Sequence, residues 1–71
     1  MQYVIQAKNR EIGAIPAVKY VNLEPNGAIR RVDRITQATR VDYAVAWLLL
    51  REAVGDRSNS FFKYTIEEYK P

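Results

Sequence analysis

The chain has 71 residues, with 11 Lys and Arg, 8 Asp and Glu, and a formal charge of +3. It contains neither Cys nor His, which excludes disulfides, thiolate zinc sites and Cys nucleophiles and removes the commonest general base. We treat residues 1–71 as a single domain. A domain of this size buries only about 60% of the surface that its unfolded chain exposes, so a partner would add much stability.

The sequence shows no membrane or export signal. The longest uninterrupted apolar run, Tyr43 to Leu50, has eight residues, whereas a membrane-spanning helix needs about 20. The first residues, 1–4, lack a charged region followed by a long apolar stretch, so no secretory signal is expected. A cytoplasmic protein is therefore predicted.

Two strands are expected before the first sharp turn. Gln2 to Lys8 alternates between two faces, and Ala17 to Leu23 is rich in β-branched and aromatic residues. Between them, residues 9–16 contain Gly13 and Pro16 and predict a loose connection.

Pro25-Asn26-Gly27 predicts a tight hairpin turn. Proline presets φ for the first turn position, and Gly27 supplies the positive φ that closes the hairpin. A third strand is expected from Ala28 to Ile35.

A helix is predicted from Val41 to Val54, because this run lacks Gly and Pro and is rich in helix-forming residues. Its N-terminal cap is either Thr39, in a capping box with Asp42, or Asp42 itself. Gly55 is the expected end of the helix.

A polar loop from Asp56 to Ser60 and a last strand from Phe61 to Tyr69 complete the expected order β-β-β-α-β. This order predicts an α+β fold, in which a small antiparallel sheet of three or four strands carries one helix on one face.

The expected helix has two apolar faces. One is lined by Val41, Ala44, Val45, Leu48 and Leu49. The other, which we call the seam, consists of Tyr43, Trp47, Leu50 and Val54, at spacings of four, three and four residues. Only a strip of Asp42, Ala46 and Ala53 is expected to face water.

A single small sheet can contact only one side of such a helix. Either the sheet curls, or the loop from Ile12 to Pro16 folds over, so that one chain covers both faces. Alternatively, the seam binds a partner, because large aromatic residues dominate interface energetics. A helix-mediated homodimer would also add buried surface, of which a domain of this size has little.

Four arginines follow one another closely, at Arg30, Arg31, Arg34 and Arg40, with Asp33 as the one acid among them. Guanidinium groups match phosphate bidentately, so a nucleic-acid-binding surface is one interpretation. The other interpretation is a solvated sheet face whose charges oppose edge-to-edge aggregation.

No catalytic pattern is present. The three glycines, Gly13, Gly27 and Gly55, form no phosphate-binding loop, and Ser58 and Ser60 have no imidazole to activate them. We therefore expect no enzyme activity, no catalytic residue, no cofactor, no metal site and no small-molecule substrate.

The layout resembles small phage- and prophage-encoded β-hairpin–helix–strand proteins of unknown function. The likeness lies in Tyr3-Val4-Ile5, the Gly-containing hairpin, the stretch from Ile35 to Val41 that leads into the helix, and the closing strand from Tyr64 to Tyr69. It implies a small accessory protein of a mobile element that acts by binding, with a host protein as one partner. Together these observations predict a non-catalytic interaction protein that self-associates through its helix, with a nucleic-acid-binding module as the alternative.

Overall fold

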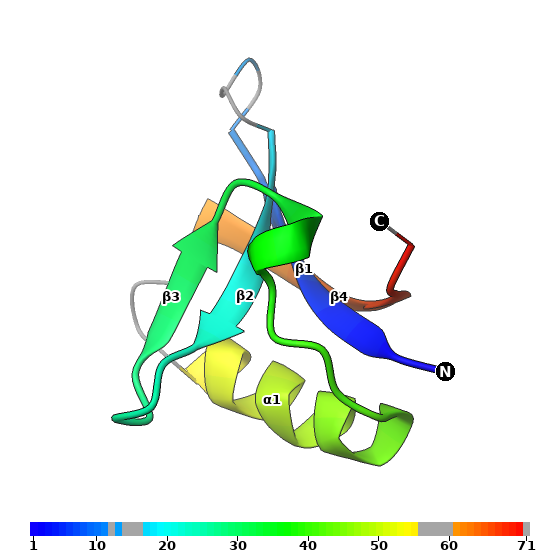
Figure 1. The fold of residues 1–71 in the computed structure, drawn as a ribbon. Helices are drawn as coiled ribbons and strands as arrows, with labels where there is room; N and C mark the ends of the chain where they lie inside the picture. Colours follow the sequence, from blue (N-terminus) through cyan, green and yellow to red (C-terminus); the bar gives the residue numbers. More distant parts are fainter. Residues whose placement is uncertain (12, 14–16, 56–60, 71) are drawn as a thin grey trace.

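The computed structural model describes residues 1–11, 13, 17–55 and 61–70. Its elements are β1 (Tyr3–Asn9), β2 (Val18–Leu23), β3 (Ile29–Val32), the 3₁₀ helix η1 (Ile35–Gln37), α1 (Tyr43–Gly55) and β4 (Phe62–Glu68). The strands form one antiparallel sheet in the order β3-β2-β1-β4, with α1 against one face (Figure 1). The predicted α+β fold is therefore confirmed. Of the predicted loops, Ile12–Pro16 is described only at Gly13, and Asp56–Ser60 lies outside the described residues.

The hairpin between β2 and β3 closes as the sequence predicts. Gly27 has a φ of 86°, and its N–H donates to the carbonyl of Glu24 at 2.9 Å. The side chain of Asn26 accepts a hydrogen bond from the N–H of Ala28 at 3.0 Å. Only glycine adopts such a φ without steric cost, which is why the turn falls at this position.

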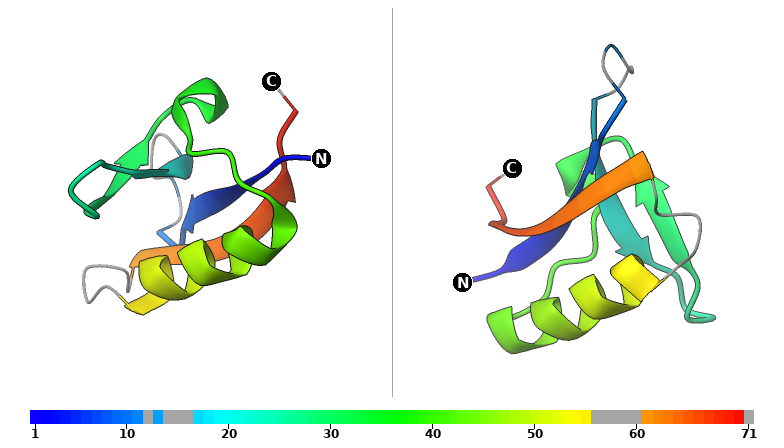
Figure 2. Two further views of the ribbon diagram at one scale, coloured as in Figure 1. Left: turned by 60° about the horizontal axis from the view of Figure 1, so that its bottom comes forward. Right: turned by 180° about the vertical axis from the view of Figure 1, so that it is seen from behind.

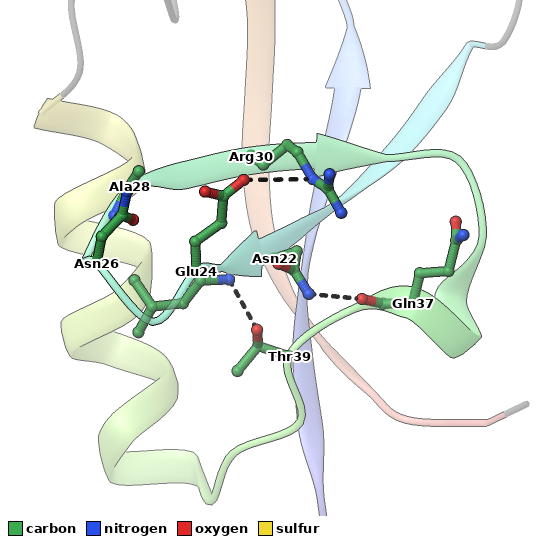
Figure 3. A network of polar contacts seen from close by, with 8 residues as sticks. Asn22, Glu24, Asn26, Ala28, Arg30, Gln37 and Thr39 are labelled. Carbon is green, nitrogen blue, oxygen red and sulfur yellow. Dashed lines mark hydrogen bonds and ion pairs between the residues drawn. The ribbon is translucent and has the colours of Figure 1, made fainter.

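The third strand is shorter than predicted, because it ends at Val32 and Ile35 begins η1. After Val32 the chain turns back over the sheet, where the side-chain amide of Asn22 donates to the carbonyl of Gln37 at 2.8 Å (Figure 3). These contacts to β2 replace the strand pairing that was predicted to continue to Ile35.

The face of the sheet opposite α1 is covered by the segment around η1 (Figure 2). Val4 and Val32 point to this face and are buried together with Ala38, the residue that follows η1. The apolar side chains on both faces of the sheet are thus sheltered, one face by α1 and the other by a single helical turn.

Between η1 and α1 the chain passes through an opening in the sheet, between β1 and β2. The N–H of Thr39 donates to the carbonyl of Val21 in β2 at 3.1 Å, and Val41 exchanges two backbone hydrogen bonds with Tyr3 in β1, at 2.7 and 2.9 Å. The hydroxyl of Thr39 also accepts the N–H of Leu23 at 2.8 Å. The segment from Thr39 to Val41 therefore satisfies backbone groups that the diverging strands would leave open.

Asp42 is the N-terminal cap of α1. Its carboxylate accepts the N–H of Val45 at 2.8 Å, and its carbonyl accepts the N–H of Ala46 at 2.8 Å. Of the two cap alternatives, Asp42 is thus confirmed and Thr39 is wrong, because the Thr39 hydroxyl is used by β2.

The helix meets the sheet through its smallest side chains. Ala46 and Ala53 are fully buried and Leu49 nearly so, in a cluster with Ile5 and Val21. The prediction that Ala46 and Ala53 face water is therefore wrong. Alanine lets the helix backbone approach the strands closely, so the packing stripe lies between the two large apolar faces and shares only Leu49 with the first of them.

Enlarging this stripe should destabilise the fold. Ala46→Leu adds volume at a site with no exposed surface, and overpacking of this kind costs about 1–3 kcal/mol. Ala44→Leu, on the exposed side of the same helix, should change the free energy of unfolding by less than about 0.5 kcal/mol. Urea denaturation of the two variants measures the difference, and equal stabilities would contradict the packing described here.

The hydroxyl of Thr39 should stabilise the fold by accepting the N–H of Leu23 beside the opening in the sheet. Thr39→Val keeps the shape but leaves the N–H of Leu23 without its acceptor, which costs about 1–2 kcal/mol. Thr36→Val, at an exposed position in η1, is the matched control. Thermal unfolding should separate the two variants by several degrees in Tm.

Candidate functional site

The solvent side of α1 is largely apolar. Its exposed large side chains, with their exposed fractions, are Tyr43 at 52%, Val45 at 43%, Trp47 at 54%, Leu48 at 63% and Val54 at 60%. Within Tyr43–Gly55 only Arg51 and Glu52 carry charge. A contiguous exposed surface of this kind is typical of interaction sites, whereas single exposed apolar residues are ordinary.

Three of the four seam residues are exposed, namely Tyr43, Trp47 and Val54. Leu50 differs, because it is half-buried and packs against the core cluster. The seam therefore borders the contact between helix and sheet along one side, and Leu50 joins the exposed surface to the core.

The aromatic residues of the seam are held in a chain of ring contacts. The ring of Tyr43 meets that of Tyr3 in β1 at a centroid distance of 5.1 Å and an interplanar angle of 67°. It also meets Trp47 at 6.2 Å and 87°. Both pairs have the edge-to-face geometry that aromatic quadrupoles favour, so Trp47 is oriented by contacts that begin in the sheet.

A shallow groove lies beside the indole. Its volume is 410 Å³, and it is lined by Trp47, Leu48, Leu50, Arg51 and Val54. The lining is apolar apart from Arg51. This arrangement can accept a large apolar side chain from another molecule.

The opposite flank of α1 faces β2. There a groove of 160 Å³ is lined by Leu23, Val41, Val45, Leu48, Leu49 and Glu52. Val45, Leu48 and Leu49 belong to one of the two predicted apolar faces, for which the sequence left open whether the sheet covers it. Only Leu49 is buried, so Val45 and Leu48 enlarge the exposed surface beyond the seam.

The four arginines do not form one surface. Arg30 pairs with Glu24 at 3.6 Å, while Arg31 points to the helix face of the sheet, over the ring of Phe62 at 4.7 Å. The guanidinium of Arg31 also donates to the hydroxyl of Tyr64 at 3.1 Å.

The other two arginines lie elsewhere again. Arg34 is exposed where η1 begins. The guanidinium of Arg40 lies 5.0 Å from the ring centroid of Tyr69, after β4. Arg30, Arg31 and Arg40 therefore make separate local contacts, and the structure does not bring the four arginines together.

Two further properties concern the described residues as a whole. Among them no group of three or more carboxylate, imidazole or thiol side chains lies close enough to hold a metal ion. No helix in the described ranges has the length and hydropathy needed to cross a bilayer.

Because Leu50 is half-buried between the exposed seam and the core, its truncation should affect stability more than truncation of an exposed seam residue. Leu50→Ala removes half-buried surface that touches the core and should lower the free energy of unfolding by about 1–2 kcal/mol. Val54→Ala, on the same seam but 60% exposed, should lower it by less than about 0.5 kcal/mol. Urea denaturation at one fixed protein concentration measures both, and a larger loss for Val54→Ala would contradict the assignment.

Comparison of the chain with protein-family models, with curated proteins and with solved structures found no match.

Proposed function

We propose that this chain is a non-catalytic protein-interaction module that self-associates through the seam on the solvent side of α1. The observation that carries the proposal is Trp47, which is 54% exposed in the middle of an apolar helix surface and beside a groove. Tryptophan and tyrosine are the residue types most enriched among side chains that dominate binding energy.

The surface is suited to binding because its aromatic residues are already ordered. Tyr3, Tyr43 and Trp47 fix one another by ring contacts. A side chain that is held before binding loses less conformational entropy when the complex forms, so more of the burial energy appears as affinity.

A second copy of the chain is the partner that this surface fits. The seam recurs at spacings of four, three and four residues, which is the spacing by which two helices pack side by side. In a two-fold arrangement the same patch meets itself, and the groove beside Trp47 can receive the aromatic side chain of the other copy.

Nucleic-acid binding receives less support. Of the arginines that suggested it, Arg30 is engaged with Glu24, Arg31 with Tyr64 and Phe62, and Arg40 with Tyr69, in different parts of the molecule. A phosphate backbone is bound best by cations that line one surface, and that alignment is missing for these four residues.

Self-association should be measurable and should depend on Trp47. Analytical ultracentrifugation at micromolar concentration should detect a dimer. Trp47→Ser should raise its Kd by roughly thirtyfold, because loss of a central aromatic residue costs about 2 kcal/mol or more.

The matched control is Val45→Ser, on the flank of α1 that faces β2. It lies on the same helix and is also exposed, at 43%, yet it is outside the seam, so its Kd should stay within about threefold of the original. A chain that remains monomeric at all accessible concentrations would contradict the proposal. Equal weakening by the two variants would contradict the central role of the seam.

A further inference from the structure

β4 forms one edge of the sheet and pairs with β1 along its whole length. The N–H of Arg10 donates to the carbonyl of Phe61, and the N–H of Tyr69 to that of Gln2, both at 2.8 Å. Antiparallel pairing alternates, so the odd-numbered residues of β4 bond to β1. The backbone groups of Phe62, Ile66 and Glu68 therefore point away from β1, toward the outer edge.

Two side chains of opposite charge lie at equal distances on either side of the middle of β4. Thr65 is the central residue of Phe62–Glu68. Lys63 lies two residues before it and Glu67 two residues after it, so all three point to the sheet face opposite α1. Lys63 and Glu67 are exposed, and neither forms an ion pair with another described residue.

The geometry points to β4 as the docking edge for a second copy of the chain, whose own β4 pairs with it antiparallel about a two-fold axis at Thr65. This inference rests on the self-association proposed above and names the arrangement of the two copies. In this register Lys63 lies opposite Glu67 of the second copy, and Glu67 lies opposite its Lys63.

The same register also lets the backbone N–H and C=O groups on the outer edge of β4 form hydrogen bonds. It sets Phe62 opposite Glu68 of the second copy, and both of these residues direct their N–H and C=O groups outward, as a hydrogen-bonded pair requires. Thr65 and Lys63 then fall at non-hydrogen-bonded pairs, where opposing side chains approach most closely. A shift by one residue would bring inward-pointing groups to the interface and break the ladder.

Within its own chain Lys63 has an unfavourable neighbour. It lies directly opposite Lys8 of β1, and like charges at such positions destabilise a sheet. A carboxylate supplied from the other side of β4, by Glu67 of the second copy, would offset this repulsion. The pairing thus gives a role to a charge arrangement that costs energy in the single chain.

The paired sheets would also bring the two seams together. The flank of α1 that carries Val45 faces β2, so the seam lies on the other flank, toward β4, and α1 runs alongside β4 in Figure 2. A two-fold axis perpendicular to the sheet leaves both helices on the same face. With α1 over β1 and β4 and strands about 4.8 Å apart, the helix axes would be about 10 Å apart, a usual packing distance.

Charge exchange along β4 tests the inference. Lys63→Glu or Glu67→Lys alone creates two like-charge contacts at the interface and should raise the dimer Kd about tenfold at low salt. The double variant K63E/E67K restores opposite charges and should return the Kd to within about threefold of the original. Lys63→Glu also removes the repulsion from Lys8, so weaker dimerisation cannot be ascribed to a weaker fold.

Cross-linking tests the register directly, because the chain contains no cysteine. Thr65→Cys places two thiols opposite each other at the two-fold axis, at a spacing that a disulfide can bridge. It should form a covalent dimer on mild oxidation. Glu67→Cys, on the same face of the same strand, should form a covalent dimer only when mixed with Lys63→Cys.

The outcomes separate the two proposals. A dimer that is weakened by Trp47→Ser but unaffected by the charge exchanges, with equal cross-linking of Thr65→Cys and Glu67→Cys, would overturn the β4 pairing and leave the helix interface standing. A monomeric wild-type chain would overturn self-association itself. Rescue by K63E/E67K together with selective cross-linking at Thr65 would establish the pairing.

Discussion

The close approach of α1 to the sheet is the constraint on which the rest of this structure depends. Because two of the three buried residues of the helix are Ala46 and Ala53, with Leu49 as the third, its contact with the strands is narrow and leaves most of the larger apolar side chains on either side. A helix that packed through leucines at all three positions would have hidden more of them. The exposed indole of Trp47 is thus a direct result of where the alanines fall in the helical repeat.

Much of the fold could be read from local sequence signals. Alternation predicted β1 and β4, β-branched and aromatic residues predicted β2, and Gly27 predicted the turn because only a positive φ closes it there. The end of β3 could not be predicted, because neither Gly nor Pro interrupts the chain between Gly27 and Ile35. What ends the strand is the docking of Gln37 and Thr39 onto β2, and such long-range contacts leave no local mark in the sequence.

The candidate site was only partly predictable. The spacing of Tyr43, Trp47, Leu50 and Val54 identified an apolar flank, but the rotation of the helix about its axis depends on side-chain volume against the sheet. Alanine is compatible with either water or close packing, so periodicity alone assigned Ala46 and Ala53 to the wrong side. The opposite directions of Arg30 and Arg31 follow from strand alternation, whereas the contact of Arg40 with the ring of Tyr69 joins distant parts of the chain and could not be predicted.

The passage of Thr39–Val41 between β1 and β2 bears on the order in which the chain can fold. Tyr3 is held by Val41 on one side and by β4 on the other, so both partners of this end of β1 are made much later during synthesis, whereas the other end pairs with the neighbouring β2. Such non-local closure is slow compared with the formation of a helix or a hairpin. The β2–β3 hairpin and α1 can therefore form first, and the N-terminal end of β1 finds its final position only when Val41 and β4 have closed on it.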